Sequence, residues 1–339
     1  MRLIKTEDAV GHVLCHDMTQ IIKDQYKDAR FRKGHVVTEE DIPVLLSMGK
    51  EHLYVWEMTP GMVHENDAAE RLLALCGQEN MIRSGVKEGK IELKAACDGV
   101  FLVDSARLVA VNSQDEVMIA TRKGGMAVRE GDKLAGMRVI PLIIEEEKLR
   151  KAEQAAGDKQ LLSLKPYVRK TACIVATGGE VKKGLIKDTF TPVVIDKLKT
   201  YGIETLEVVY SGDGVENVRD AVLTMREKKP DMILCTGGMS VDPDDNTPGG
   251  IKAAGANIIA YGAPVLPGAM FLLGYFDDGM PVMGLPGCVM YAGATVFDLV
   301  LPKIAADVPV TRADLAALGE GGLCLGCKPC HYPICPFGK

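Results

Sequence analysis

Residues 231–250 read DMILCTGGMSVDPDDNTPGG and place two glycines beside a cluster of acids. Gly237 and Gly238 follow an apolar run, and glycine allows backbone N–H groups to approach a bound anion closely. The aspartates that follow, Asp242, Asp244 and Asp245, would repel that anion unless a hard cation lay between them. Mg²⁺ is such a cation, because it takes oxygen ligands and binds together with phosphates. The stretch therefore predicts either a phosphate–Mg²⁺ site or a tight turn with solvated aspartates.

Three further glycine-rich turns accompany this one in the second half of the chain. TGGEVKKGLIKDTF begins at Thr177, SGDG spans 211–214, and GLPGCVM spans 284–290. Each follows an apolar run, and a helix N-terminus behind such a turn favours an anion, although an ordinary strand-to-helix turn has the same pattern. The candidate ligand-binding residues are Thr177, Gly178, Gly179, Glu180, Thr236, Gly237, Gly238, Ser240, Asp245, Pro286 and Gly287.

Four of the ten cysteines fall in the last sixteen residues. Cys324, Cys327 and Cys330 are spaced C-x₂-C-x₂-C, and Cys335 follows with a proline behind it. This run is similar to that of bacterial ferredoxins, with one extra residue in the last gap. It predicts a [4Fe–4S] cluster or a Zn²⁺ site, with His331 as an alternative zinc ligand, whereas redox-active thiols are the alternative without metal. The Pro- and Gly-rich tail is not expected to build a core.

These candidate sites need a framework of strands and helices. From residue 170 onward, apolar runs alternate with amphipathic segments, which predicts an α/β fold with a three-layer parallel sheet and ligands at the C-terminal strand ends. Residues 90–144 are rich in short apolar runs, among them LVAVN, which predict strands. The expected divisions are an N-terminal module (1–60), a β-rich middle region with a charged linker helix (61–165), the α/β domain (166–310) and the cysteine-rich tail (320–339).

Charge and hydropathy exclude several classes of protein. The net charge of −6 argues against nucleic acid as a partner. No apolar run reaches the ~18 residues of a membrane span, so no membrane contact is expected. The N-terminal residues MRLIKTEDAVGH carry acids where a secretory signal has its apolar core, which predicts a cytoplasmic protein.

The spaced motifs resemble those of the molybdopterin-binding domain family, which includes the molybdenum insertases, among them the E domain of gephyrin, and the smaller adenylyltransferases. TGGMSVDPDD resembles the family's T-G-G-x-S-x-x-x-x-D loop, and TGGEV at 177–181 resembles its T-G-x-E-L turn. GLIKDT at 184–189 and GLPG at 284–287 are similar to two further motifs in the same order. The resemblance covers roughly 170–308. EDAVGHVLCHDM near the N-terminus resembles the opening of the insertases more weakly.

This resemblance implies a molybdopterin molybdenumtransferase that binds molybdopterin or its adenylylated form and inserts molybdate with Mg²⁺. It assigns catalysis to Asp245 and Asp188, places Glu180 at the family's glutamate, and implies a homo-oligomer, with a dimer expected. A molybdoenzyme partner is then expected to receive the cofactor. Phe190, Cys288 and Ala269 depart from the family's Asn, Asn and Lys. These departures favour the alternative, a non-catalytic molybdopterin carrier or regulatory protein.

Overall fold

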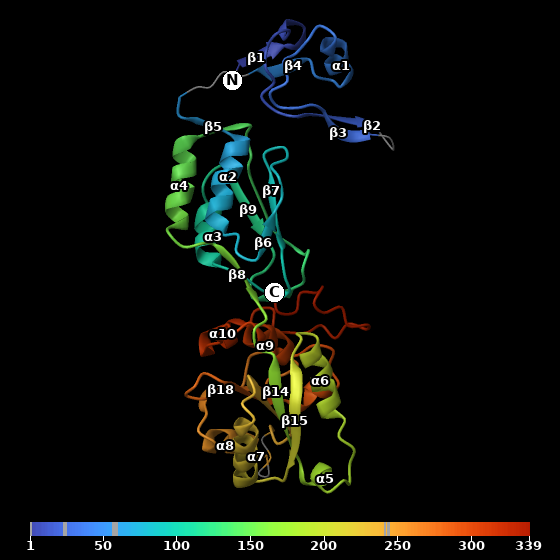
Figure 1. Ribbon diagram of the computed structural model, residues 1–339, viewed down its shortest axis with the longest axis vertical. Coiled ribbons are helices and arrows are strands. Elements are labelled where there is room, and N and C mark those ends of the chain that lie inside the picture. The colour runs from blue at the N-terminus through green and yellow to red at the C-terminus, as the bar shows by residue number, and fades with distance from the viewer. Residues whose placement is uncertain (1, 23–25, 56–59, 241, 243–244) are drawn as a thin grey trace. The chain divides into compact units, whose positions relative to one another are not determined.

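The computed structural model describes residues 2–22, 26–55, 60–240, 242 and 245–339, apart from the side chains of Tyr26 and Lys182. The chain forms two compact units (Figure 1). Unit 1 comprises Met1–Ala96, Val103–Gly124 and Gly131–Ser163, and unit 2 comprises Cys97–Leu102, Gly125–Glu130 and Leu164–Lys339. The backbone therefore passes from one unit to the other several times. No helix in the described ranges is long and apolar enough to cross a membrane.

Unit 1 begins with a small mixed module built on two antiparallel strand pairs. Its elements are β1 (Arg2–Lys5), η1 (Thr6–Asp8), β2 (Met18–Ile22), β3 (Tyr26–Phe31), α1 (Asp41–Ser47) and β4 (His52–Val55). Leu14, Phe31 and Leu45 are buried at its centre. The sequence predicts Thr38 as the N-cap of α1, but the helix begins at Asp41. The amide and hydroxyl of Thr38 instead donate to the Asp41 carboxylate, at 2.8 and 2.9 Å.

The remainder of unit 1 packs helices on a four-stranded sheet in the order β6-β7-β11-β9. Its strands are β5 (Met62–His64), β6 (Met81–Arg83), β7 (Ile91–Ala95), β9 (Val117–Thr121), β11 (Lys133–Val139) and β12 (Ile143–Glu145). Its helices are α2 (Glu65–Cys76), α3 (Ser105–Asn112) and α4 (Glu146–Ala156). The charged helix α4 buries Leu149, Ala152 and Ala156 and contacts α2 and α3.

The predicted strand LVAVN is wrong, because these residues lie in α3. Asp104 caps this helix by accepting a hydrogen bond from the amide of Arg107 at 3.1 Å, and its other oxygen pairs with the Arg107 guanidinium at 2.8 Å. Val111 is buried while Val109 is 65% exposed, so the apolar run does not lie flat in a sheet. An N-cap aspartate can outweigh the strand propensity of so short an apolar run.

Unit 2 contains a three-stranded sheet in the order β10-β8-β13 and a six-stranded sheet in the order β15-β14-β16-β19-β18-β17. The strands are β8 (Gly99–Val103), β10 (Met126–Val128), β13 (Leu162–Pro166), β14 (Thr171–Thr177), β15 (Glu204–Ser211), β16 (Met232–Thr236), β17 (Asn257–Tyr261), β18 (Leu272–Tyr275) and β19 (Pro281–Leu285). The helices are α5 (Gly179–Lys182), α6 (Phe190–Lys199), α7 (Val215–Glu227), α8 (Thr247–Ala253), η2 (Gly287–Met290), α9 (Val296–Ala305) and α10 (Arg312–Ala317).

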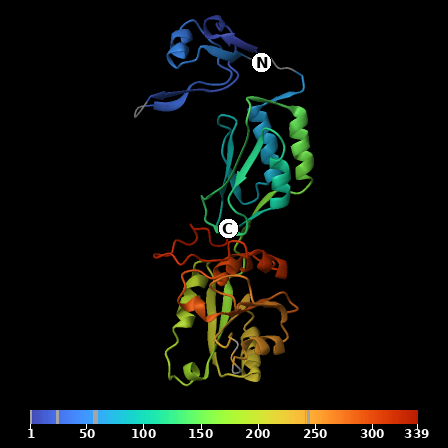
Figure 2. The same cartoon turned by 180° about the vertical axis from the view of Figure 1, so that it is seen from behind.

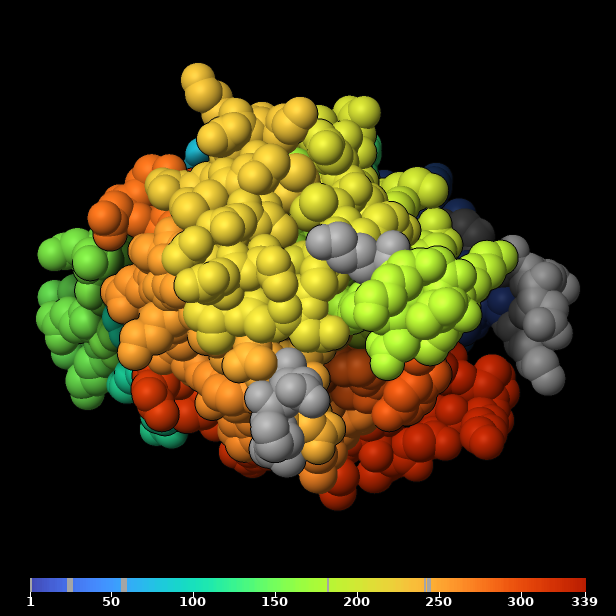
Figure 3. All heavy atoms as spheres, turned by 90° about the horizontal axis from the view of Figure 1, so that it is seen from below, coloured from blue at the N-terminus to red at the C-terminus, as the bar shows by residue number. Residues whose placement is uncertain are grey.

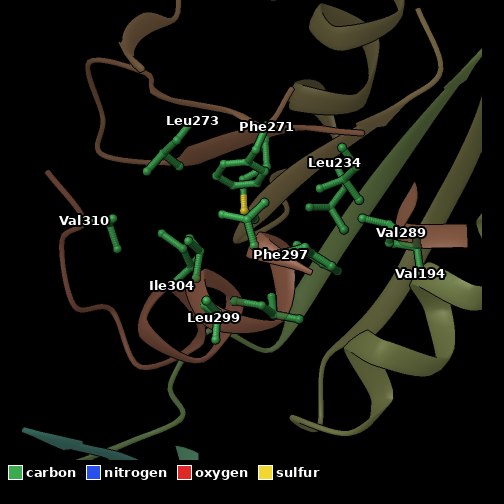
Figure 4. Packing of buried hydrophobic residues seen from close by; sticks show 14 of the residues in the cluster. Val194, Leu234, Phe271, Leu273, Val289, Phe297, Leu299, Ile304 and Val310 are labelled. Atoms are coloured by element: carbon green, nitrogen blue, oxygen red, sulfur yellow. The ribbon is translucent and has the colours of Figure 1, made fainter. Parts of the chain in front are cut away.

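Helices cover both faces of the six-stranded sheet, which confirms the α/β fold class (Figure 2). Residues that alternate along β14 enter two separate cores. Ala172 and Ile174 pack with α6 and α9, whereas Cys173 and Val175 pack with α7 and α8. Phe271 and Phe297 lie at the centre of the first core (Figure 4). The alternation of strands and helices in the sequence therefore produces three layers.

The sheet is not parallel throughout. β14, β15, β16 and β19 pair in parallel, but β18 pairs antiparallel with both β19 and β17. The sequence interpretation missed β18, which joins β17 to the sheet. The largely apolar sequence of residues 289–306 predicts a single helix, but the structure has η2, a turn and then α9 there. Thr295 begins α9 with a capping box that it forms with Asp298.

The tail contributes to the core of unit 2, contrary to the expectation that it could not. Phe337 is 2% exposed and belongs to the same core cluster as Phe297. The Tyr332 hydroxyl donates to the backbone oxygen of Asp298 at 3.0 Å. The amide of Cys324 donates to the carbonyl of Leu266 at 2.8 Å. Two aromatic side chains and a backbone contact therefore anchor this Pro- and Gly-rich segment.

Candidate functional site

The C-terminal ends of β14, β16 and β19 lie side by side. Parallel pairing sets Ala176 of β14 beside Thr236 of β16, and Thr236 beside Leu285 of β19. Thr177, the last residue of β14, pairs with Ser211 of β15 on the other side. The four glycine-rich turns follow these strands, so they meet at one edge of the sheet. Ligands of open α/β sheets bind at this edge.

Glycine is required at both positions of the turn after β16. Gly237 and Gly238 have φ angles of +81° and +56°, which L side chains rarely adopt. A Cβ on Gly237 would lie 2.4 Å from the carbonyl oxygen of Thr177. A Cβ on Gly238 would lie 2.6 Å from the Thr247 hydroxyl. The two glycines therefore let this turn pack directly against the end of β14.

A pair of buried threonine hydroxyls joins the turn to the neighbouring elements. The Thr177 hydroxyl donates to the carbonyl of Thr236 at 2.9 Å and lies 3.2 Å from the Thr247 hydroxyl. The Thr247 hydroxyl donates to the carbonyl of Gly237 at 2.9 Å, and its amide donates to the carbonyl of Gly238 at 3.1 Å. These bonds hold β14, the turn after β16 and the first residue of α8 in one arrangement.

Asp245 braces the second half of the same loop. Its Oδ2 accepts a hydrogen bond from the Ser240 amide at 2.8 Å, and its own amide donates to the carbonyl of Asp242 at 2.9 Å. The Tyr261 hydroxyl donates to the carbonyl of Met239 at 2.9 Å. Burial raises the pKa of Tyr261, and the charge of Asp245 raises it further. Asp244, one of the three acids of the motif, lies outside the described residues.

Asp188 caps α6. Its Oδ1 accepts hydrogen bonds from the amides of Phe190 and Thr191 at 2.9 and 3.0 Å. Its Oδ2 accepts from the Tyr210 hydroxyl at 3.3 Å. Burial acts to raise the pKa of Asp188, but the hydrogen bonds from Thr191, Phe190 and Tyr210 outweigh it, so the pKa lies below its ordinary value. The predicted catalytic residue is therefore an ionised carboxylate already bound by three donors.

The turn after β14 uses its backbone donors within the protein. The amide of Gly178 donates to the carbonyl of Ser211 at 3.3 Å, and that of Gly179 donates to the Asp213 carboxylate at 3.0 Å. Figure 3 views the molecule from below, and α5 lies there beside the residues that follow β15. Glu180 is exposed on α5. In this arrangement the amides of Gly178 and Gly179 are not available to a phosphate, and their predicted ligand role stays a prediction.

The GLPG turn contacts the region around Asp188. Pro286 precedes η2, which begins at Gly287. The Thr189 hydroxyl donates to the sulfur of Met290 at 3.1 Å, which joins η2 to the residue after Asp188. Sequence reasoning left four contributors out of the candidate set: Tyr210, Asp213, Thr247 and Met290. Asp213, Thr247 and Met290 had a signal, because all three stand inside motifs already singled out, whereas Tyr210 had none.

The described residues hold no group of three or more His, Cys, Asp or Glu side chains arranged around a metal ion. The tail thiols are also not assembled, since Cys324 and Cys335 pack against the core while Cys327 and Cys330 are exposed. The predicted cluster or zinc site does not fit this arrangement of the tail, and both metals stay predictions.

Two parts of the chain match known protein families. Residues 173–306 match a model described as a probable molybdopterin binding domain. Residues 3–57 match a model described only as a domain of unknown function. The first match contains the predicted loop residues from Thr177 to Gly287, and the second contains the N-terminal module.

Individual relatives cover small parts of the chain. A CinA-like protein of Mycobacterium tuberculosis is 33% identical over 76 residues, which make up 22% of this chain and 18% of that protein. One of Petrotoga mobilis is 32% identical over 76 residues, or 22% of this chain and 19% of that protein. The chain thus spans about a fifth of the length of these curated relatives.

Solved structures with detectable similarity include MoaB of Thermus thermophilus, a molybdopterin biosynthesis enzyme, and CinA of Thermoplasma acidophilum. The first is 16% identical and covers 42% of this chain and 98% of that chain, with a TM-score of 0.36. The second is 18% identical and covers 40% of this chain and 98% of that chain, with a TM-score of 0.35.

Proposed function

We propose that this chain, whose residues 173–306 are a domain of the molybdopterin-binding family of molybdenum cofactor biosynthesis, binds molybdopterin at the edge formed by β14, β16 and β19. One observation carries the proposal. The turn at Gly237 and Gly238 admits no side chain, and the hydroxyls of Thr177 and Thr247 hold it against β14. Such a turn is preorganised, so little conformational entropy is lost when a ligand binds.

The proposed reaction is insertion of molybdate into adenylylated molybdopterin, with release of the nucleotide. In this proposal Asp245 holds the loop in its binding conformation through the Ser240 amide. Asp188 supplies a fixed negative charge at the neighbouring turn, because its carboxylate is held ionised by three donors. The described residues do not form a Mg²⁺ site by themselves, so no step is assigned to that ion.

A second candidate, a non-catalytic molybdopterin carrier, is favoured by a specific observation. The Asp188 oxygens are both used to cap α6 and to bind Tyr210, which is a structural role. Phe190 and Cys288 also stand where the family has asparagine. A carboxylate has about four acceptor sites, so Asp188, which already accepts three hydrogen bonds, has little capacity left for a substrate.

Two measurements on the full chain distinguish these candidates. Molybdopterin binding, followed by fluorescence, should saturate for the natural chain and weaken by roughly tenfold for Asp245→Ala, because a charged acceptor of the loop is lost. Asp277→Ala, which removes an exposed carboxylate from the turn before β19, is the control and should bind normally. Absence of saturable binding by the natural chain would reject both candidates.

Turnover then decides between them. The assay is molybdate-dependent release of nucleotide from adenylylated molybdopterin by the full chain. Release that depends on Asp245 supports the insertase. Binding without release supports the carrier, and release that survives Asp245→Ala would remove Asp245 from the proposed mechanism.

A further inference from the structure

The N-terminal module contains a polar cavity, which is distant in sequence from the glycine-rich turns of unit 2. The cavity measures about 700 Å³ and lies between the end of β3 and the start of α1. Arg30, Arg32 and His35 are among its lining residues. This segment matches a model described as a domain of unknown function, a description that names no ligand.

Local geometry gathers these cationic side chains. Arg30 and Arg32 flank Phe31, which is 7% exposed and faces the core, and both arginines are exposed. The pairing of β3 with β2 shifts at this point, since Phe31 pairs with Met18 whereas Ala29 pairs with Thr19. The His35 amide donates to the carbonyl of Arg32 at 3.0 Å, and Gly34 has a φ of +86°. This tight turn returns His35 to the side of the strand. The rings of His35 and Phe31 lie 5.1 Å apart, which holds the imidazole in place.

The charges around the cavity are not balanced within the described residues. Among them, no carboxylate lies within ion-pair distance of the guanidinium of Arg30 or Arg32. Asp41 also lines the cavity, but its Oδ2 accepts from His35 at 2.6 Å and from both donors of Thr38. Its charge is therefore largely used. Lys33 and Glu40 also line the cavity, so three lining Arg and Lys side chains stand against two carboxylates.

We propose that Arg30, Arg32 and His35 form a binding site for a small tetrahedral oxyanion of the molybdate, phosphate and sulfate class. A guanidinium presents a planar fork of donors that matches two oxygens of such an anion. In the proposed site Arg30 and Arg32 supply these forks, and His35, whose Nε2 is bonded to the Asp41 carboxylate at 2.6 Å, borders the anion. The inference stands independently of pterin binding, although molybdate as the preferred anion would connect the module to the proposed reaction.

Calorimetric titration of the full chain at an ionic strength of about 0.15 M, where the Debye length is about 8 Å, tests the proposal. The probes are sodium molybdate, inorganic phosphate and sodium sulfate, each titrated without any pterin. Saturable binding with one site is expected, and Arg30→Gln combined with Arg32→Gln should weaken it by at least roughly tenfold, because charge-assisted hydrogen bonds are lost. Tighter binding of molybdate than of phosphate and sulfate would identify a substrate site. Equal affinities for the three anions would identify a general oxyanion site. Both outcomes support the proposal.

A matched control is Lys27→Gln, which removes one positive charge from the same strand at a residue that does not line the cavity. It should leave the affinity within about twofold, because the long-range charge effect is screened. Equal losses for Lys27→Gln and the arginine pair would overturn the site, as would the absence of saturable binding.

If the glutamine pair fails to fold, Arg30→Lys with Arg32→Lys decides the question. These variants keep both charges but lose the fork, so a several-fold loss of affinity is expected, and unchanged affinity would reject the site. Molybdopterin binding is measured on the same proteins and should not change. A failure of pterin binding is thereby distinguished from a failure of this site.

Discussion

Replacing Thr177 with valine tests whether the buried hydroxyls of Thr177 and Thr247 set the geometry of the turn that follows β16. Valine keeps the shape of the side chain but removes the donor to the Thr236 carbonyl and the neighbour of the Thr247 hydroxyl. Thr177 is only 9% exposed, so water does not replace the lost partner freely. Thr177→Val should lower the free energy of unfolding by about 1–3 kcal/mol, because the buried carbonyl of Thr236 loses a hydrogen-bond donor.

The assay is a double-mutant cycle in chemical and thermal unfolding. Thr177→Val, Thr247→Val and the double variant should show a coupling free energy of about 1 kcal/mol, because each residue loses the same network. The melting temperature should fall by about 2–4 °C for each kcal/mol in a unit of this size. Molybdopterin affinity should fall with it.

Thr205→Val is the matched control for this cycle. The Thr205 hydroxyl is buried on β15 without a hydrogen-bond partner among the described residues. Its removal should be neutral or slightly stabilising, because an unsatisfied polar group is deleted. Additive effects of the first two variants, within about 0.5 kcal/mol, would refute the idea that their hydroxyls act together.

Three further predictions concern the loop, the tail and pH. Gly237→Ala should lower the free energy of unfolding and weaken molybdopterin binding, because the added Cβ would lie 2.4 Å from a backbone oxygen. Gly255→Ala is the control: Gly255 has a φ of +91° but open space around it, so this variant should be destabilised only by the backbone strain of about 1–2 kcal/mol. Phe337→Ala should cost about 3–5 kcal/mol in urea unfolding, whereas Ile334→Ala, at a residue 86% exposed, should cost little. The pKa of Asp188 is lower in the folded chain, so its contribution to stability is present above the unfolded-state pKa of about 4 and is lost as pH falls through the folded value. The free energy of unfolding of Asp188→Asn, measured from pH 7 to pH 3, should therefore fall less on acidification than that of the natural chain. An equal fall in both proteins would contradict the prediction.

Much of unit 2 could be predicted from local pattern. The apolar run before Gly237 and Gly238 forms β16, and the two glycines form the turn that follows it, with φ angles of +81° and +56°. Alternating strands and helices predict a layered α/β sheet, which the structure confirms. These features depend on neighbours in sequence, which is why single-residue chemistry and periodicity suffice to find them.

The errors arose where contacts are distant in sequence or where a cap competes with a strand pattern. Thr177 and Thr247 meet through 70 residues of intervening chain, and no spacing rule connects them. Phe337 packs in a core whose other buried residues lie between 172 and 315, far from the tail in sequence. The Pro- and Gly-rich composition of the tail gives no sign of this packing. At 105–112, the Asp104 cap outweighed an apolar run typical of a strand.

The repeated passage of the backbone between the two units limits how this protein can be divided. The segments Cys97–Leu102 and Gly125–Glu130 belong to unit 2 although unit 1 residues lie between and on either side of them. A gene fragment that begins near residue 164 would encode β13 without β8, its partner in the three-stranded sheet. Such a fragment would present an unpaired strand edge, and exposed edges of this kind promote aggregation. Recombination that transplants unit 2 must therefore carry the segments Cys97–Leu102 and Gly125–Glu130 with it.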